Sequence, residues 1–148
     1  EWDSGTEESW QAGTVNEFEN SNRLHSAYLA VLGYEQEIKR RVWQAQLSVL
    51  FPAIEELRLA LIEHLGSVLT VPFTTEQGYI IHDRLDLEIG HIYYQLRSLS
   101  YANSELNISV YQLRKLRNIL AHMDPIPKSE IALVENLESI GQMLLQKS

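Results

Sequence analysis

The sequence contains no cysteine among its 148 residues. This absence excludes thiol catalysis, disulfide frameworks and zinc sites built on cysteine ligands. A chain of this length can still bury a hydrophobic core without a disulfide or a structural metal, so we expect one folded domain. The lack of cysteine is consistent with a cytoplasmic location, which we also expect.

Long apolar runs are missing as well. Runs such as Leu59–Ile62 end at a charged residue within a turn, whereas a membrane-spanning helix needs roughly 20 apolar residues. No signal-peptide pattern stands at the start, and the chain begins at Glu1 rather than at a methionine. We therefore expect no membrane partner, and we expect a piece of a longer protein that can carry additional domains.

Basic residues are few, since 12 Lys and Arg stand against 20 Asp and Glu and give a net charge of −8. Such a balance normally argues against nucleic acid as a partner, because a polyanion needs a basic surface. The acidity is uneven, however: residues 1–37 hold eight acidic side chains and one basic one, which leaves 12 acidic and 11 basic for residues 38–148. This nearly neutral remainder contains two basic clusters, Lys39–Arg41 and the group Arg114, Lys115 and Arg117.

The chain divides into a leading segment and a helical domain. Residues 1–20 mix small, polar and acidic residues without periodicity, which predicts an acidic linker or a disordered arm. Residues 21–148 place apolar residues at helical spacing and predict an all-α bundle of four to five helices in antiparallel up-down order. Tyr79–Ile81 is an apolar triplet without a partner in the sequence, so we do not expect it to form a stable strand.

The helix boundaries follow from breakers and caps. We expect a first helix that ends near Gly33, and then the longest helical pattern, from Ile38 to Leu65. Pro52 must either kink that second pattern or divide it into two helices. The later helices are expected to begin after Asp83, near Ile108 and after Ser129.

The predicted helix that ends at His122 has two different faces. Residues four apart lie on one face, so Arg114, Asn118 and His122 form a polar stripe. Arg117 lies beside the apolar face, where a guanidinium group needs a carboxylate, a phosphate or a neighbouring subunit. The apolar stripe expected in the core consists of Leu113, Leu116 and Leu120.

This helix resembles the signature of HEPN domains, in which Arg is followed directly by a polar residue, often Asn, and then by His four to six residues after the Arg. The resemblance implies a helical bundle that forms a homodimer and joins two copies of the motif in one cleft. Many members of that family are metal-independent endoribonucleases, and others are inactive binding domains. The matching string is Arg117-Asn118-Ile119-Leu120-Ala121-His122.

The residue types suit cleavage of single-stranded RNA, which carries its own nucleophile in the 2′-hydroxyl. We predict catalytic roles for Arg117, Asn118 and His122: His122 transfers a proton, Arg117 binds phosphate oxygens, and Asn118 orients the histidine or the substrate. Arg114 and Lys115 are the predicted substrate-binding residues. RNA is the expected partner, and neither a cofactor nor a metal is required.

Each of these side chains also has a purely structural interpretation. His122 can bind the free carbonyls in the last helical turn, and Asn118 can bond its own backbone. Arg117 can pair inside the bundle with Glu55, Glu56 or Glu88. The alternative function is then a non-catalytic helical module for dimerisation or docking within a larger protein.

A metal site is the weaker candidate. Glu88 and His91 have the Glu-x-x-His spacing of di-metal carboxylate sites, and His82-Asp83 lies nearby. Such sites need a second Glu-x-x-His and two further acids on facing helices, for which the sequence offers only Glu63-His64 and scattered acids, so we predict no metal. The aromatic residues expected in the core or at a subunit contact are Trp43, Tyr93, Tyr94 and Tyr111.

Overall fold

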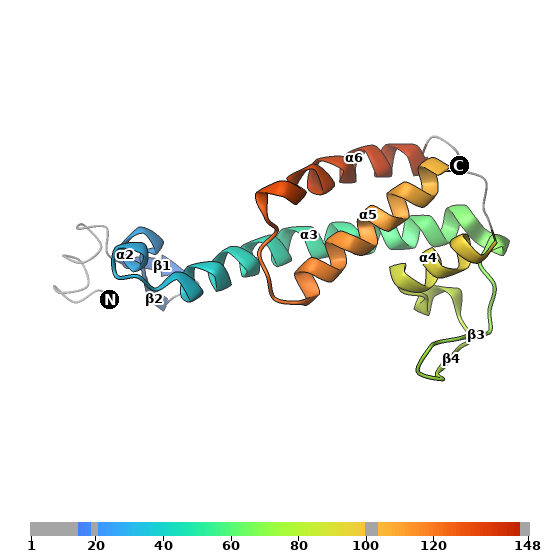
Figure 1. Cartoon of the computed structure of the whole chain (residues 1–148), viewed down its shortest axis with the longest axis horizontal. Coiled ribbons are helices and arrows are strands. Elements are labelled where there is room, and N and C mark those ends of the chain that lie inside the picture. Colours follow the sequence, from blue (N-terminus) through green and yellow to red (C-terminus); the bar gives the residue numbers. More distant parts are fainter. Residues whose placement is uncertain (1–14, 19–20, 100–103, 146–148) are drawn as a thin grey trace.

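The computed structural model describes residues 15–18, 21–99 and 104–145. Over these residues the chain is mainly α-helical, as predicted. Figure 1 shows α3 running along most of the molecule, with α2 at one end and α4, α5 and α6 gathered around the other part of α3. The α-helices are α2 (Ser26–Val31), α3 (Glu35–Leu65), α4 (Ile89–Ser98), α5 (Ser104–Ala121) and α6 (Ile131–Leu145).

Two small antiparallel strand pairs were not predicted. β1 (Val15–Phe18) pairs with β2 (Ser21–Leu24), within and just after the predicted linker, of which residues 1–14 and 19–20 lie outside the described residues. β3 (Phe73–Thr74) pairs with β4 (Ile80–Ile81), so the apolar triplet does have a partner. Gly78, with a φ of 87°, allows the tight turn between β3 and β4.

The second helical pattern forms one helix of 31 residues, α3, which continues through Pro52. The alternative of two helices divided at Pro52 is therefore wrong. Proline removes a single backbone donor and strains the preceding turn at a cost of about 3 kcal/mol. The turns that follow bury Ile54, Leu61, Ile62 and Leu65, and this burial offsets the cost.

The up-down order holds from α4 to α6 but not from α3 to α4, and this part of the prediction is wrong. The guanidinium of Arg58 on α3 donates to the carbonyl of Leu87 at 3.0 Å, just before α4 begins. Gln95, near the end of α4, accepts from the backbone N–H of Thr70 at 2.8 Å, just after α3 ends. The two helices therefore run in the same direction, because residues 66–88 return along α3 before α4 starts (Figure 1).

Several helix boundaries also differ from the prediction. Asp83 caps the short 3-10 helix η2 (Arg84–Asp86) instead of α4, and Glu88 forms a capping box with His91 at the start of α4. α5 begins at Ser104, four residues before Ile108. Ser129 lies inside the 3-10 helix η3 (Lys128–Glu130), which leads directly into α6. Another 3-10 turn, η1 (Gly66–Val68), follows α3.

The core lies where α5 packs against α3, α4 and α6. The predicted apolar stripe of Leu113, Leu116 and Leu120 is fully buried. Each fully buried side chain of this size contributes about 1.5–3 kcal/mol relative to an exposed one. The other fully buried large side chains are Ile54, Leu61, Leu69, Leu87, Ile92, Leu96, Leu106 and Val110. Within the described residues, no helix is both long enough and apolar enough to cross a membrane.

We predict that Gly141→Ala stabilises the fold, whereas Gly66→Ala destabilises it. An added Cβ at Gly141 in α6 meets Leu57 Cδ2 at 3.5 Å, an ordinary contact, so alanine should add about 0.5–1 kcal/mol through its higher helix propensity. Gly66 has a φ of 49° and a ψ of −119°, and a side chain there should cost about 1–3 kcal/mol. Thermal denaturation of both variants measures the effects. A lower melting temperature for Gly141→Ala would contradict this packing of α6 on α3, and an unchanged or higher one for Gly66→Ala would contradict the backbone strain at Gly66.

Candidate functional site

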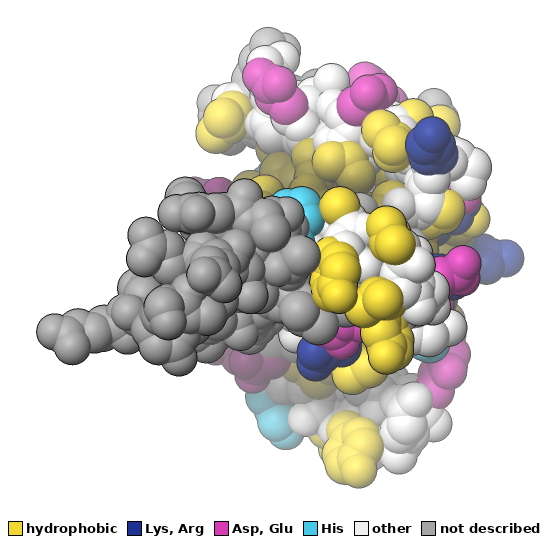
Figure 2. Space-filling model, turned by 90° about the vertical axis from the view of Figure 1, so that its left-hand side faces the viewer, with side chains coloured by type: hydrophobic (Ala, Val, Ile, Leu, Met, Phe, Trp, Pro, Cys, Tyr) yellow, Lys and Arg dark blue, Asp and Glu magenta, His cyan; other side chains and the backbone are white. Residues whose placement is uncertain are grey.

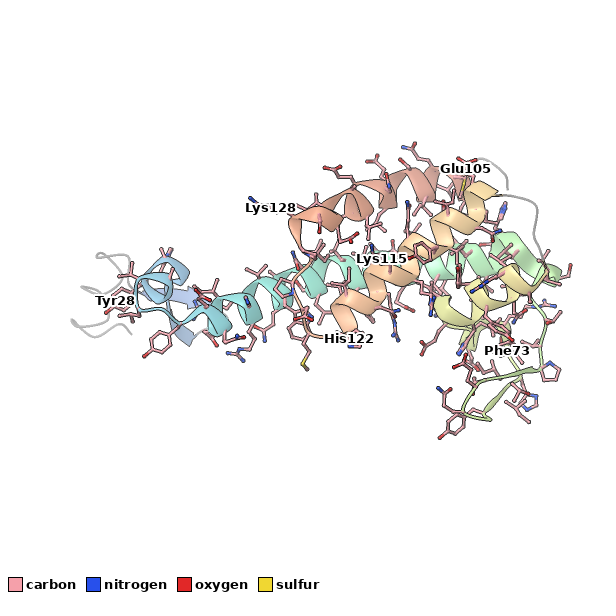
Figure 3. All side chains as sticks on the ribbon, viewed as in Figure 1. Tyr28, Phe73, Glu105, Lys115, His122 and Lys128 are labelled. Atoms are coloured by element: carbon pink, nitrogen blue, oxygen red, sulfur yellow. The ribbon has the colours of Figure 1, made fainter. Side chains whose placement is uncertain are left out.

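The polar face of α5 forms one wall of a groove with a volume of about 860 Å³, which we call the α5 groove. The first half of α3 forms the opposite wall, and the connection between α5 and η3 closes one end. Figure 3 shows Lys115 midway along α5 and His122 at its end, next to this connection. The groove is lined by Ile38, Lys39 and Val42 from α3, by Tyr111, Arg114, Lys115, Asn118, Ile119 and His122 from α5 and beyond, and by Asp124, Pro125 and Pro127.

Two long-range hydrogen bonds join α3 to the end of α5 and to the connection that follows it. The indole N–H of Trp43 donates to the carbonyl of Leu120 at 2.7 Å, in the last turn of α5. The side-chain oxygen of Gln46 accepts from the backbone N–H of Ile126 at 2.8 Å, and Ile126 itself is buried. Trp43 thus lies in a structural contact, as the sequence predicted. The connection that carries Asp124 and Pro125 is therefore fixed to α3.

His122 stands directly after the end of α5. Its backbone N–H still bonds the carbonyls of Asn118 and Ile119, at 3.1 and 3.3 Å. The next residue, Met123, has a φ of 60° and ends the helical path. The imidazole is exposed and faces the groove together with Asn118. Histidine is the side chain that gains and loses a proton most readily near neutral pH, so this position can support proton transfer.

Acidic neighbours neutralise some of the basic side chains around the groove. The ammonium group of Lys115 donates to Glu130 Oε1 at 2.7 Å, and this hydrogen bond raises the pKa of Lys115. On α3, hydrogen bonds from Arg40 hold the pKa of Glu37 below its usual value, and Arg41 pairs with the same carboxylate. Over the described part of the chain, no ion pair involves Lys39 or Arg114. These two cations are therefore the ones free to meet an anion in the groove.

Arg114 is held by aromatic rings rather than by a carboxylate. Its guanidinium carbon lies 5.1 Å from the centroid of the Tyr93 ring, within the range of a cation–π interaction. Tyr93 in turn packs against Tyr111, with ring centroids 5.8 Å apart. Tyr93 packs against the core, as predicted, whereas Tyr111 is 48% and Tyr94 58% exposed, so neither of these two rings lies in the core. Arg114 therefore keeps a defined position while its charge stays available.

Arg117 is the one predicted site residue that the fold does not bring into the α5 groove. Its guanidinium pairs with Glu88 at 3.0 Å, on a different face of α5, in a small pocket beside η2 and the start of α4. Arg117 is 35% and Glu88 59% exposed, so the pair is largely solvated. Of the other candidate partners, Glu55 bonds Arg58 at 2.9 Å instead. The structure thus gathers Arg114, Lys115, Asn118 and His122 but leaves Arg117 apart from them.

Glu88 and His91, the main residues of the weaker metal hypothesis, bond to each other at the start of α4. The Nδ1 atom of His91 accepts from the backbone N–H of Glu88 at 3.2 Å, and its ring lies 5.3 Å from that of Phe73. Among the residues that the structure describes, no group of three or more His, Asp or Glu side chains is placed to hold a metal ion.

The sequence did not identify the α3 wall of the groove. From the sequence, Lys39 belongs only to a basic cluster, and no role in a site is predicted for Val42 or Asp124. The cluster Lys39–Arg41 was the one available signal, since it repeats the positive charge found near Arg114. Which of its side chains faces α5 depends on how the two helices pack, and the sequence does not show this.

Comparison with known proteins finds no protein family, no curated protein and no solved structure that matches this chain. The HEPN resemblance therefore rests on the motif at the end of α5 and on the helical architecture, and it stays a prediction.

We predict that Arg117 and Glu88 are weakly coupled in stability. Arg117→Ala should lower the free energy of unfolding by less than about 1 kcal/mol, because the ion pair is largely exposed. Glu88→Ala also removes the capping side chain of α4 and should cost about 0.5–2 kcal/mol. The double substitution should cost less than the sum of the two single ones, which urea denaturation can measure as a coupling energy. Arg117→Ala combined with Glu56→Ala is the control and should be additive. A coupling energy of zero between Arg117 and Glu88 would show that their contact contributes nothing in solution.

Proposed function

We propose that the α5 groove binds single-stranded RNA. The observation that carries this proposal is that Arg114, Asn118 and His122 line one groove with Lys39 of the opposite wall. Lys39 and Arg114 supply charge for the phosphates, and Tyr111, which is 48% exposed, supplies an aromatic face for a base. Asn118 adds an amide group that can bond to a base or to the 2′-hydroxyl.

The net charge of the chain does not oppose this proposal, because association depends on the local charge. The groove lining contains the cations Lys39, Arg114 and Lys115 and a single carboxylate, Asp124. Lys115 is partly neutralised by Glu130, which leaves a modest positive surface. Modest charge predicts weak binding that depends on salt, as phosphate contacts release counterions from the RNA.

We predict that Arg114→Ala weakens RNA binding at low salt and lowers its salt dependence. For single strands, each lost phosphate contact should reduce the slope of log affinity against log salt by about 0.7. Fluorescence anisotropy with a 5′-labelled RNA measures both quantities. Lys128→Ala is the matched control, because Lys128 is an exposed cation outside the groove lining. Equal affinities and slopes for the two variants, or no binding by the unaltered chain, would contradict the proposal.

The proposal extends to metal-independent cleavage, for which the HEPN resemblance is the support. The 2′-oxygen attacks the adjacent phosphorus, the bond from phosphorus to the 5′-oxygen breaks, and a 2′,3′-cyclic phosphate forms. A base takes the proton of the 2′-hydroxyl and an acid protonates the leaving 5′-oxygen. His122 is the group in each groove suited to one of these transfers.

A second copy of the chain, in a dimer, would give Arg117 a role in cleavage. Within one chain Arg117 lies on a different face of α5 from the groove and pairs with Glu88. In a two-fold dimer that packs the motif helices together, Arg117 of one copy approaches the groove of the other and exchanges Glu88 for a phosphate oxygen. Glu88→Gln should then leave cleavage intact, while Arg117→Ala should abolish it.

We predict that His122→Ala lowers the rate of RNA cleavage by about 10²-fold or more, because a positioned proton donor or acceptor is lost. The assay is run in EDTA, and the product end is identified as a 2′,3′-cyclic phosphate. His82→Ala, at an exposed histidine outside the groove, is the matched control. RNA with a 2′-O-methyl group at the cut site should resist cleavage, and DNA of the same sequence should resist it too. Cleavage of either at the normal rate would contradict the mechanism.

Mixing the inactive Arg117→Ala and His122→Ala variants tests the composite site. Half of the randomly mixed dimers contain both variants, and each of these has one intact site of two, so about a quarter of the activity should return. Melting temperatures of both variants must be compared alongside. If no activity returns although both variants are folded and dimeric, Arg117 does not act across a dimer.

A second candidate function is non-catalytic dimerisation or docking, and an exposed apolar surface favours it. Val31 at the end of α2, Leu32 and Tyr34 just after it, and Val49 on α3 are exposed, with Val31 83% exposed. Figure 2 shows hydrophobic side chains gathered on the end of the molecule formed by α2 and the start of α3. A dimer in light scattering, together with no RNA binding in the anisotropy titration, is the outcome that favours this function.

A further inference from the structure

A second pocket lies between the β3–β4 hairpin and α4, and we call it the hairpin pocket. Its volume is about 550 Å³. Phe73 and Thr75 contribute the hairpin side, and His91, Tyr94 and Arg97 contribute the α4 side. Figure 3 shows Phe73 at the base of the hairpin, beneath α4.

Arg114 belongs to the lining of both pockets. Between them lies the aromatic pair formed by Tyr93, which lines the hairpin pocket, and Tyr111, which lines the α5 groove. The guanidinium of Arg114 rests over the Tyr93 ring at 5.1 Å. The two pockets are therefore neighbours that share one cation, and a strand that leaves the α5 groove past Arg114 enters the hairpin pocket.

The chemistry of the hairpin pocket repeats that of the α5 groove. Tyr94 is 58% exposed, and its ring is held edge-on against Phe73 at a centroid distance of 6.1 Å. A ring that is both exposed and supported offers a face on which a base can stack. Arg97 is exposed and forms no ion pair among the described residues, and Glu76 is the one carboxylate in this lining.

We propose that the hairpin pocket is a second nucleotide subsite for the same single-stranded RNA, in which Tyr94 stacks on a base and Arg97 contacts a phosphate. The inference rests on the proposed RNA binding in the α5 groove. Two observations support the second subsite itself: Arg114 lines both pockets, and Tyr94 and Arg97 on α4 place an aromatic ring beside a cation. An RNA long enough to fill both pockets should bind more tightly than one that fills the groove alone.

The test measures anisotropy of the full chain with labelled oligouridine RNAs of about 3 to 16 nucleotides, a range that covers common single-strand site sizes. Affinity should rise with length until both pockets are filled. Tyr94→Leu should weaken binding of the longest RNA by about tenfold and leave the shortest unchanged, whereas Tyr94→Phe should keep the tight binding. Tyr79→Leu is the matched control, because Tyr79 is an exposed tyrosine on the same hairpin that lines neither pocket.

The outcomes separate this inference from the function on which it rests. Arg114→Ala should weaken binding at every length, and Arg97→Ala should lower the salt slope for long RNAs only. If Tyr94→Leu and Tyr79→Leu bind long RNA equally well, the second subsite is overturned while the α5 groove keeps its function. If the unaltered chain binds RNA of no length, the proposed function itself is wrong.

Discussion

Burial of one face of α5 is the constraint on which the rest of the molecule depends. Leu113, Leu116 and Leu120 are fully buried where α5 meets α3, α4 and α6. This contact sets the rotation of α5 about its axis, because a helix repeats every 3.6 residues. Arg114 and Asn118 are consequently turned toward the first half of α3, and the α5 groove follows from the packing without any special backbone geometry.

The parts of the fold that repeat with helical period could be predicted, and the parts that depend on a few residues could not. The apolar stripe of α5 was correct because three leucines recur at helical spacing. The β3–β4 pairing was missed because two residues on each side leave no periodic signal. The predicted direction of α4 was wrong because up-down order assumes short connections, whereas residues 66–88 return along α3. Arg58 on α3 and Gln95 on α4 hold this connection by hydrogen bonds to Leu87 and Thr70.

The candidate site was predictable on the side formed by a single helix. Arg114, Asn118 and His122 share a face by spacing alone, so their proximity needed no tertiary knowledge. The opposite wall depends on contacts between residues far apart in sequence, such as Trp43 with Leu120, separated by 77 positions, which no local pattern encodes. For Arg117 the physical argument that a charge beside the core needs a partner was sound, and it named Glu88 among three carboxylates, but the sequence could not choose among them.

The distribution of ion pairs determines which cations can serve a ligand. Glu37 engages Arg40 and Arg41, Glu130 engages Lys115, and Glu88 engages Arg117. A phosphate that approaches those cations competes with these carboxylates, at a modest cost because the pairs are partly exposed. Arg114 is held instead over the ring of Tyr93, and this contact orients the guanidinium without neutralising it. An acidic chain can thereby keep an unneutralised positive charge, that of Arg114, where its two pockets meet.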